Sequence, residues 1–177
     1  MWVNDNMHHP STCPLTCWVE AGYEGQASSS TGTQEDFFWG DVRPGDSHIN
    51  YHFISNLQTS DYGGTVLITI QYTSTNRFEI DVIAPTQGYA YYSTNNGMTA
   101  DDIEIGQELQ GTTGASSGVA HFTDNRWISL NDAANLQTSD APVRSYAPGS
   151  TNPVSGNWST HPSSSNPGGN FYTSCGC

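Results

Sequence analysis

Short stretches in which apolar and polar residues alternate recur along the chain, and they limit its fold more than any other feature. A two-residue period is typical of β-strands with one buried face, and the only helical pattern is a weak one at residues 130–136. Nine such strands are predicted within 177 residues, which favours an all-β fold: a jelly-roll or concanavalin-like β-sandwich of two antiparallel sheets. They occupy residues 17–24, 37–43, 48–54, 65–72, 77–84, 88–92, 102–109, 118–123 and 126–130.

The composition divides the chain into three segments. We expect residues 1–16 to form an N-terminal arm and residues 17–140 to form the sandwich. Residues 141–177 are rich in Pro, Ser and Gly, a composition typical of irregular structure, and we expect them to form a strap across the domain. The hexapeptide Asn-Leu-Gln-Thr-Ser-Asp occurs at 56–61 and again at 135–140, which suggests two similar turns.

All four cysteines lie near the ends of the chain, at Cys13, Cys17, Cys175 and Cys177. A Cys175–Cys177 disulfide would close a strained ring, so we expect the N-terminal pair to bond to the C-terminal pair. A link that closes about 160 residues contributes up to roughly 5 kcal/mol in the chain-entropy model. Disulfides imply an oxidising compartment, and we therefore expect a secreted, extracellular protein. The cysteine spacing is not a common zinc pattern, and no metal is expected.

The charges are almost all negative. The chain has four Arg and no Lys against 17 acidic residues, a formal net charge of −13 at pH 7. Nucleic acids and anionic membranes require clustered cations, so we expect neither as a partner. The sequence has no run of about 20 apolar residues, so we do not expect it to span a membrane. In acid the carboxylates lose their charge, so the composition favours tolerance of low pH. The alternative explanation is that secreted proteins avoid Lys because its absence protects them from proteases.

Two segments share the pattern E-x-G-x-E: Glu20 to Glu24 and Glu104 to Glu108. In a strand, residues i, i+2 and i+4 lie on one face, so each segment places two carboxylates on one face with a glycine between them. If the two strands are close, Glu20 and Glu104 form a pair in which one carboxyl acts as acid and the other as base. The simpler interpretation is that these glutamates only solvate an exposed face.

Residues 17–24, followed by 37–44 (FFWGDVRP), resemble the early strands of the glutamic peptidases called eqolisins. They also resemble secreted bacterial β-sandwich proteins of unclear function. Eqolisins activate water with a Gln and a Glu on adjacent strands, and the related plant neprosins use two Glu. The resemblance implies Glu20 and Glu104 as the catalytic pair, with Gln107 as another partner and Asp41 as the acidic residue of the aromatic strand. The sequence departs from eqolisins at Glu20 and at Gly40-Asp41-Val42.

The resemblance implies a hydrolase that needs no cofactor and acts on a polypeptide. We expect the substrate to be bound by Trp39, Glu24, Glu108, His52 and Tyr91. Exposed aromatic residues beside polar planar side chains are also typical of carbohydrate-binding sandwiches, which would make the ligand a polysaccharide. A structural or interaction role at the cell surface is the third hypothesis. His48 and His52 are four residues apart, but isolated histidines on a strand are more often packing residues than metal ligands. The sequence does not predict the oligomeric state.

Overall fold

The computed structural model describes residues 1–5, 13, 16–28, 32–74, 76–98, 102–106, 117–127, 137–138, 158–163 and 170–175. These residues form β-strands almost throughout, with one short 3-10 helix, so the predicted all-β fold is confirmed. The chain divides into two compact units, Met1–Glu104 and Ile105–Cys177. Within the described residues, no helix is long and apolar enough to cross a membrane.

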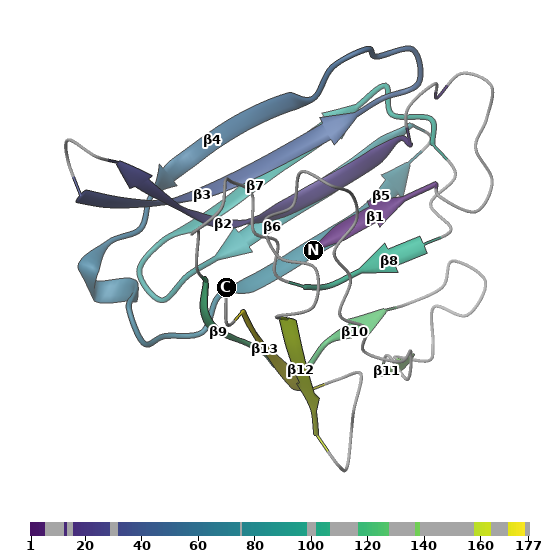
Figure 1. Cartoon of the computed structure of the whole chain (residues 1–177). Helices are drawn as coiled ribbons and strands as arrows, with labels where there is room; N and C mark the ends of the chain where they lie inside the picture. The colour runs from purple at the N-terminus through teal and green to yellow at the C-terminus, as the bar shows by residue number, and fades with distance from the viewer. Residues whose placement is uncertain are drawn as a thin grey trace. The chain divides into compact units, whose positions relative to one another are not determined.

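The first unit contains a five-stranded antiparallel sheet with the order β4-β3-β2-β1-β8, which can be followed in Figure 1 from β4 to β8. Strand β1 was not predicted. It lies between β2 and β8, so the strands that carry Glu20 and Glu104 are separated by one strand. The strands are β1 (Trp2–Asn4), β2 (Trp18–Ser28), β3 (Gly32–Val42), β4 (Asn50–Asn56) and β8 (Asp102–Glu104).

The second sheet of this unit is a meander of β5 (Leu67–Ser74), β6 (Arg77–Ile83) and β7 (Gly88–Thr94). The strands predicted at 65–72 and 77–84 therefore pair with each other as a hairpin. Asn76 occupies its turn with φ 63°, a left-handed conformation that Asn tolerates better than most residues. Strand β2 contacts both β5 and β6, so the two sheets pack face to face as a sandwich.

Alternation along the strands builds the core between these two sheets. Val19, Ala21, Phe37 and Trp39 of the five-stranded sheet lie in one buried cluster with residues of the meander. Burial of each large apolar side chain contributes about 1.5–3 kcal/mol. The meander contributes Phe78, Ile80, Val82 and Ala84.

The second unit contains a three-stranded sheet of order β12-β13-β9 and a two-stranded sheet, β10-β11. Strands β12 and β13 run through the segment predicted to be an irregular strap. The predicted helical turn at 130–136 lies outside the described residues. The strands are β9 (Ser117–Phe122), β10 (Arg126–Trp127), β11 (Gln137–Thr138), β12 (Trp158–Pro162) and β13 (Phe171–Cys175).

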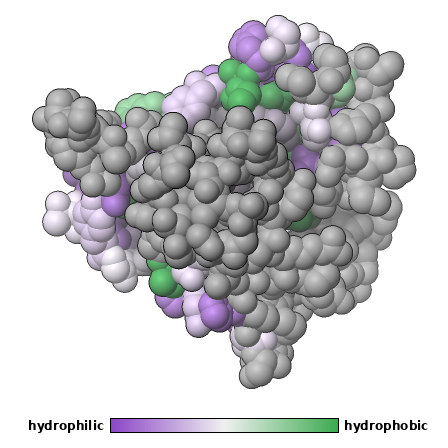
Figure 2. Space-filling view, viewed as in Figure 1, coloured by the Kyte–Doolittle hydropathy of each residue, from purple (hydrophilic) through white to green (hydrophobic). Residues whose placement is uncertain are grey.

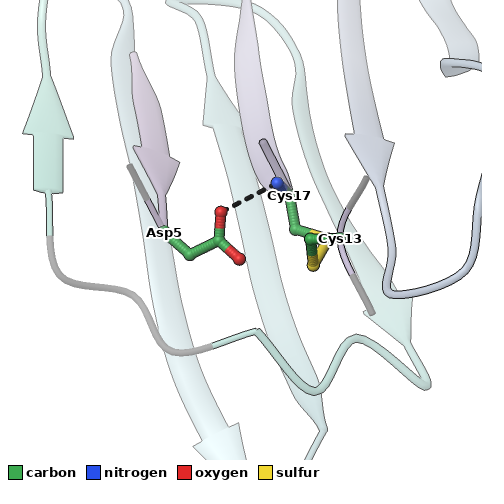
Figure 3. A group of neighbouring side chains, drawn as sticks. All are labelled: Asp5, Cys13 and Cys17. Carbon is green, nitrogen blue, oxygen red and sulfur yellow. Dashed lines mark hydrogen bonds between the residues drawn. A yellow bond between two sulfur atoms is a disulfide. The ribbon is translucent and has the colours of Figure 1, made fainter. Parts of the chain in front are cut away.

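The predicted disulfide pairing is wrong, because Cys13 bonds to Cys17 rather than to the C-terminal pair (Figure 3). Their Cα atoms are 5.6 Å apart, within the usual disulfide range. Asp5 fixes this geometry: its N–H donates to the Cys17 carbonyl (3.1 Å), and its Oδ1 accepts from the Cys17 N–H (2.9 Å). A loop this short contributes only about 2 kcal/mol in the chain-entropy model. Cys177 and the side chain of Cys175 lie outside the described residues.

The first copy of the repeated hexapeptide ends in the 3-10 helix η1 (Thr59–Asp61). The buried Asp61 carboxylate accepts hydrogen bonds from the Gln58 N–H, from the N–H and hydroxyl of Thr86, and from the Gln87 amide. It therefore joins η1 to the turn between β6 and β7. Of the second copy, the structure describes only residues 137–138, in β11, so the prediction of two similar turns is not tested.

The parts of the described surface that are coloured in Figure 2 are mostly purple to white, with a few green areas. The exposed large apolar side chains include Tyr51 and Phe53 of β4 and Tyr172 of β13.

Candidate active site

The register of the five-stranded sheet separates its residues onto two faces. Val19 of β2 lies opposite Val3 of β1 and Asp41 of β3, and these residues are buried on the core face. Glu20 alternates with Val19 and therefore lies on the outer face, away from the β5–β7 sheet. The outer face carries the carboxylates of Glu20, Glu24 and Asp36.

One row across the outer face contains both predicted catalytic glutamates. Glu20 lies opposite Trp2 of β1, and Trp2 also lies opposite Glu104 of β8. The row continues from Glu20 to Gly40 of β3 and then to Tyr51 of β4. Directly opposed residues of a sheet share a face, so positions 20, 2 and 104 occupy one face. Trp2, which sequence reasoning did not single out, is the residue between the two glutamates.

The absence of a side chain at Gly40 leaves room for the Glu20 carboxylate. A Cβ built on Gly40 would lie 3.3 Å from Glu20 Oε1 and 3.3 Å from Trp18 Cζ3. The Glu20 carboxylate and the Trp18 ring therefore extend over the backbone of β3. In the neighbouring row, a Cβ on Gly22 would lie 3.3 Å from a Phe38 ring carbon, so this ring covers β2 in the same way. The absence of side chains at the two glycines therefore gives the Glu20 carboxylate and these two rings room to lie across the sheet.

Aromatic and acidic side chains border this row. The rings of Phe38 and Tyr51 stack with centroids 5.5 Å apart, and the Tyr51 hydroxyl donates a hydrogen bond to Glu24. Burial raises the pKa of Tyr51, and the Glu24 carboxylate raises it further. The predicted substrate-binding residue Glu24 is therefore on the same face as Glu20, held by Tyr51.

The amino group of Met1 lies close to the row. It donates to the Ala21 carbonyl at 3.0 Å. Burial lowers its pKa to about 6, and the carboxylate of Glu20 opposes that shift.

Asp41, the third predicted catalytic residue, lies on the opposite face and is not brought together with Glu20. Its buried carboxylate accepts from Arg43 Nε (2.8 Å), Asn50 Nδ2 (2.9 Å) and the Ser93 hydroxyl (2.6 Å). Ser93 belongs to the other sheet, so Asp41 links the two layers. The separation of 21 residues between Glu20 and Asp41 does not predict which face Asp41 occupies, because the face depends on the register of the β2–β3 hairpin.

Three of the predicted substrate-binding residues also lie on the core face. Trp39 is buried and stacks on His52, with ring centroids 3.9 Å apart. Its other neighbour is Tyr91 of the second sheet, at 6.1 Å. These rings form an aromatic column between the sheets, on the far side of β3 from the glutamate row. Gln107 and Glu108 lie outside the described residues.

The described residues offer little for a metal ion. His48 is exposed and precedes β4, so it does not share a strand with His52. Asp5, Cys13 and Cys17 bring one carboxylate and two sulfur atoms within 4.8 Å of one another. The sulfur atoms are bonded to each other, and a disulfide supplies no thiolate ligand. This cluster is therefore a structural junction in the oxidised protein.

The comparisons with known proteins support the fold. No known family profile matches the sequence, and no curated protein matches it. The structure is similar to the crystal structure of aspergilloglutamic peptidase from Aspergillus niger, with a TM-score of 0.61 and 18% sequence identity. The similarity covers 98% of this chain and 96% of that chain. The predicted likeness to the glutamic-peptidase fold is thereby confirmed, and at this identity it concerns the fold alone.

Proposed function

We propose that this chain is a secreted hydrolase of the glutamic-peptidase type, in which Glu20 and Glu104 activate water to cleave a polypeptide. The observation that carries the proposal is the row in which Glu20, Trp2 and Glu104 lie side by side across three strands. The fold similarity to a glutamic peptidase supports it. The Cys13–Cys17 disulfide is compatible with an extracellular location.

The spacing of the row suits a reaction that involves water. Positions two strands apart have Cα atoms about 10 Å from each other. For both carboxylates to border the space above the residue between them, here Trp2, the Glu20 carboxylate, which lies over Gly40 of β3, would turn toward β1. Hydrolases that use one carboxylate as base and another as acid hold a water molecule in such a space. One glutamate would take a proton from water as it attacks the carbonyl carbon, and the other would give a proton to the leaving amine.

The proposed mechanism requires one carboxyl to hold a proton while the other is ionised. Two carboxyls that share a site do not ionise together easily, so this state is favoured in acid. Glu24 and Asp36 add negative charge to the same face and favour it further. We therefore expect activity below neutral pH.

The test is cleavage of an unfolded protein substrate from about pH 2 to pH 8 by the wild type and by Glu20→Gln and Glu104→Gln. A glutamine neither accepts nor donates the catalytic proton, so each variant is expected to lose about 100-fold or more of kcat/KM. Glu79→Gln is the matched control, since Glu79 lies on β6 and bonds to the Tyr92 hydroxyl (3.2 Å). Its activity should equal that of the wild type.

Three other outcomes would change the proposed mechanism, reject the peptidase function or change the substrate. Activity retained in Glu20→Gln but lost in Glu20→Ala and Glu104→Gln would replace the two-carboxylate mechanism with an amide–carboxylate pair. No cleavage at any pH by folded, disulfide-bonded protein would reject the peptidase function. Cleavage of polysaccharides instead, with the same loss in both variants, would retain the pair and change the substrate.

A further inference from the structure

The second unit presents a row of three polar rings on one face of its three-stranded sheet. Tyr172 lies on the central strand β13, opposite His161 of β12 on one side and His121 of β9 on the other. The Tyr172 ring centroid is 4.3 Å from that of His161 and 5.4 Å from that of His121. All three side chains are exposed. We refer to these residues as the His–Tyr–His row.

The polar atoms of the row have no hydrogen-bond partner among the residues that the structure describes. Among the described residues, the ring nitrogens of His121 and His161 and the Tyr172 hydroxyl make no hydrogen bond to protein, and their contacts are with each other's rings. Nothing in the described fold therefore accounts for two imidazoles on either side of a tyrosine, since an apolar or hydroxyl side chain would satisfy an exposed sheet face equally well.

A depression of about 210 Å³ adjoins the row, where β9 and β12 end and β13 begins. Small polar side chains border it: Thr123, Ser163 and Asn170. Asn170 is held in place, because its carbonyl accepts from the Ser163 N–H (2.8 Å) and its Oδ1 accepts from the Asp124 N–H (2.9 Å). The stacked rings of Phe122 and Phe171 also border the depression, at the ends of the strands; they alternate with His121 and Tyr172 and so belong to the other face of the sheet.

The geometry and charge narrow the class of ligand. The Tyr172 ring lies between the imidazoles of His121 and His161, so the two do not face each other as ligands of one metal ion would. The depression is smaller than the pockets of about 300–1,000 Å³ that hold whole cofactors. A polyanion is disfavoured by the net charge of −13 and the absence of Lys.

We propose that the His–Tyr–His row and its depression form a binding site for a neutral oligosaccharide. A sugar chain is long enough to follow the row across three strands, and its hydroxyl groups both donate and accept hydrogen bonds, as imidazole and phenol groups require. One sugar ring would enter the depression beside Tyr172, with Thr123, Ser163 and Asn170 at its edge. The site lies wholly within the second unit and does not depend on the proposed hydrolase activity.

The experiment is isothermal titration calorimetry of the intact chain with cellotetraose, xylotetraose, chitotetraose and mannotetraose at millimolar concentration. At least one of these probes should bind. Tyr172→Ala should weaken that binding about tenfold or more, and His161→Ala should also weaken it. Tyr172→Phe keeps the ring and removes one hydroxyl, so it should show a smaller loss and, as the conservative variant, should fold even where Tyr172→Ala does not.

Two controls separate this site from the other unit. His48→Ala removes an exposed histidine of the first unit and should leave sugar binding unchanged. Glu20→Gln should also leave it unchanged, whatever it does to proteolysis. The proposal is overturned if no probe binds the folded wild type, or if binding is the same in Tyr172→Phe, His161→Ala and the wild type.

Discussion

Gly40 and Gly22 make room for the side chains that lie across the sheet around Glu20. Gly40 is buried and directly opposite Glu20, and Gly22 lies beneath the Phe38 ring. Neither has a positive φ among the described residues, so backbone conformation does not require glycine at these positions. Their value is the absence of a side chain, because the Glu20 carboxylate and the Trp18 ring occupy the space beside a Cβ at Gly40.

We predict that Gly40→Ala lowers kcat by about 10- to 100-fold, because small displacements of a catalytic group have effects of that size. The new methyl group would lie 3.3 Å from both Glu20 Oε1 and Trp18 Cζ3, so the carboxylate must move. Steady-state kinetics on the protein substrate measure the loss, and thermal unfolding checks that the fold is retained. Gly25→Ala is the control, since its nearest contact would be an ordinary 3.8 Å. Equal activity in Gly40→Ala and the wild type would contradict the assigned position of Glu20.

The residues of the candidate site were only partly predictable from sequence. Alternation in E-x-G-x-E correctly places Glu20 and Glu24 on one face, because the side-chain period of a strand is fixed. Which face Asp41 occupies depends on how β3 pairs with β2, and a shift of one residue would reverse it. Trp2 was missed because three residues of strand are too short for a periodic pattern. Its neighbours across the sheet come from distant parts of the sequence.

At the level of elements, Asp61 connects η1 to the turn between β6 and β7. Burial opposes ionisation of its carboxyl, but the hydrogen bonds from Thr86, Gln87 and Gln58 outweigh burial and lower its pKa. A carboxyl whose pKa is lower in the folded state stabilises the fold above its unfolded pKa of about 3.9. That contribution is lost as the pH falls through the lower folded value.

We predict that Asp61→Asn lowers the melting temperature at neutral pH, and that its deficit relative to the wild type shrinks between about pH 5 and pH 2. Differential scanning calorimetry over this range measures the effect. Asp124→Asn, which changes a largely exposed aspartate, serves as the control and should follow the wild type throughout. A deficit for Asp61→Asn that stays constant with pH would show that the ionised form is not what stabilises the junction.

Sequence reasoning identified β2 to β10 and missed β1, β11, β12 and β13. Strands β5 and β6 were predicted because β-branched residues alternate along them. Strands β12 and β13 are built from Ser, Thr, His and Tyr between Pro- and Gly-rich segments, and composition there favours irregular structure. These two strands are stabilised by pairing with neighbouring strands rather than by local propensity. The disulfide was not predicted either. The hydrogen bond between Asp5 and Cys17, which lies beside it, cannot be inferred from the spacing of four cysteines.

For the whole molecule, the net charge of −13 at pH 7 is the feature that most affects stability. Repulsion among carboxylates works against the compact state, and salt screens it. We predict that raising NaCl from about 0.01 M to about 1 M increases the melting temperature at pH 7, because the Debye length falls from about 30 Å to about 3 Å. The same salt series at about pH 4, where many carboxyls are neutral, should show a smaller increase. An equal response at both pH values would mean that charge repulsion does not limit stability.

The position of β1 between β2 and β8 affects the order in which contacts form as this protein folds. Strands β2, β3 and β4 follow one another in sequence and can form a meander from local contacts, which form quickly. The pairing of Trp2 with Glu104 joins residues about 100 positions apart, and such contacts form late because a long loop must close first. A folding intermediate that contains only this meander would therefore not bring Glu20 and Glu104 together. If Glu20 and Glu104 cleave polypeptides, newly made chains are protected from one another until folding is nearly complete.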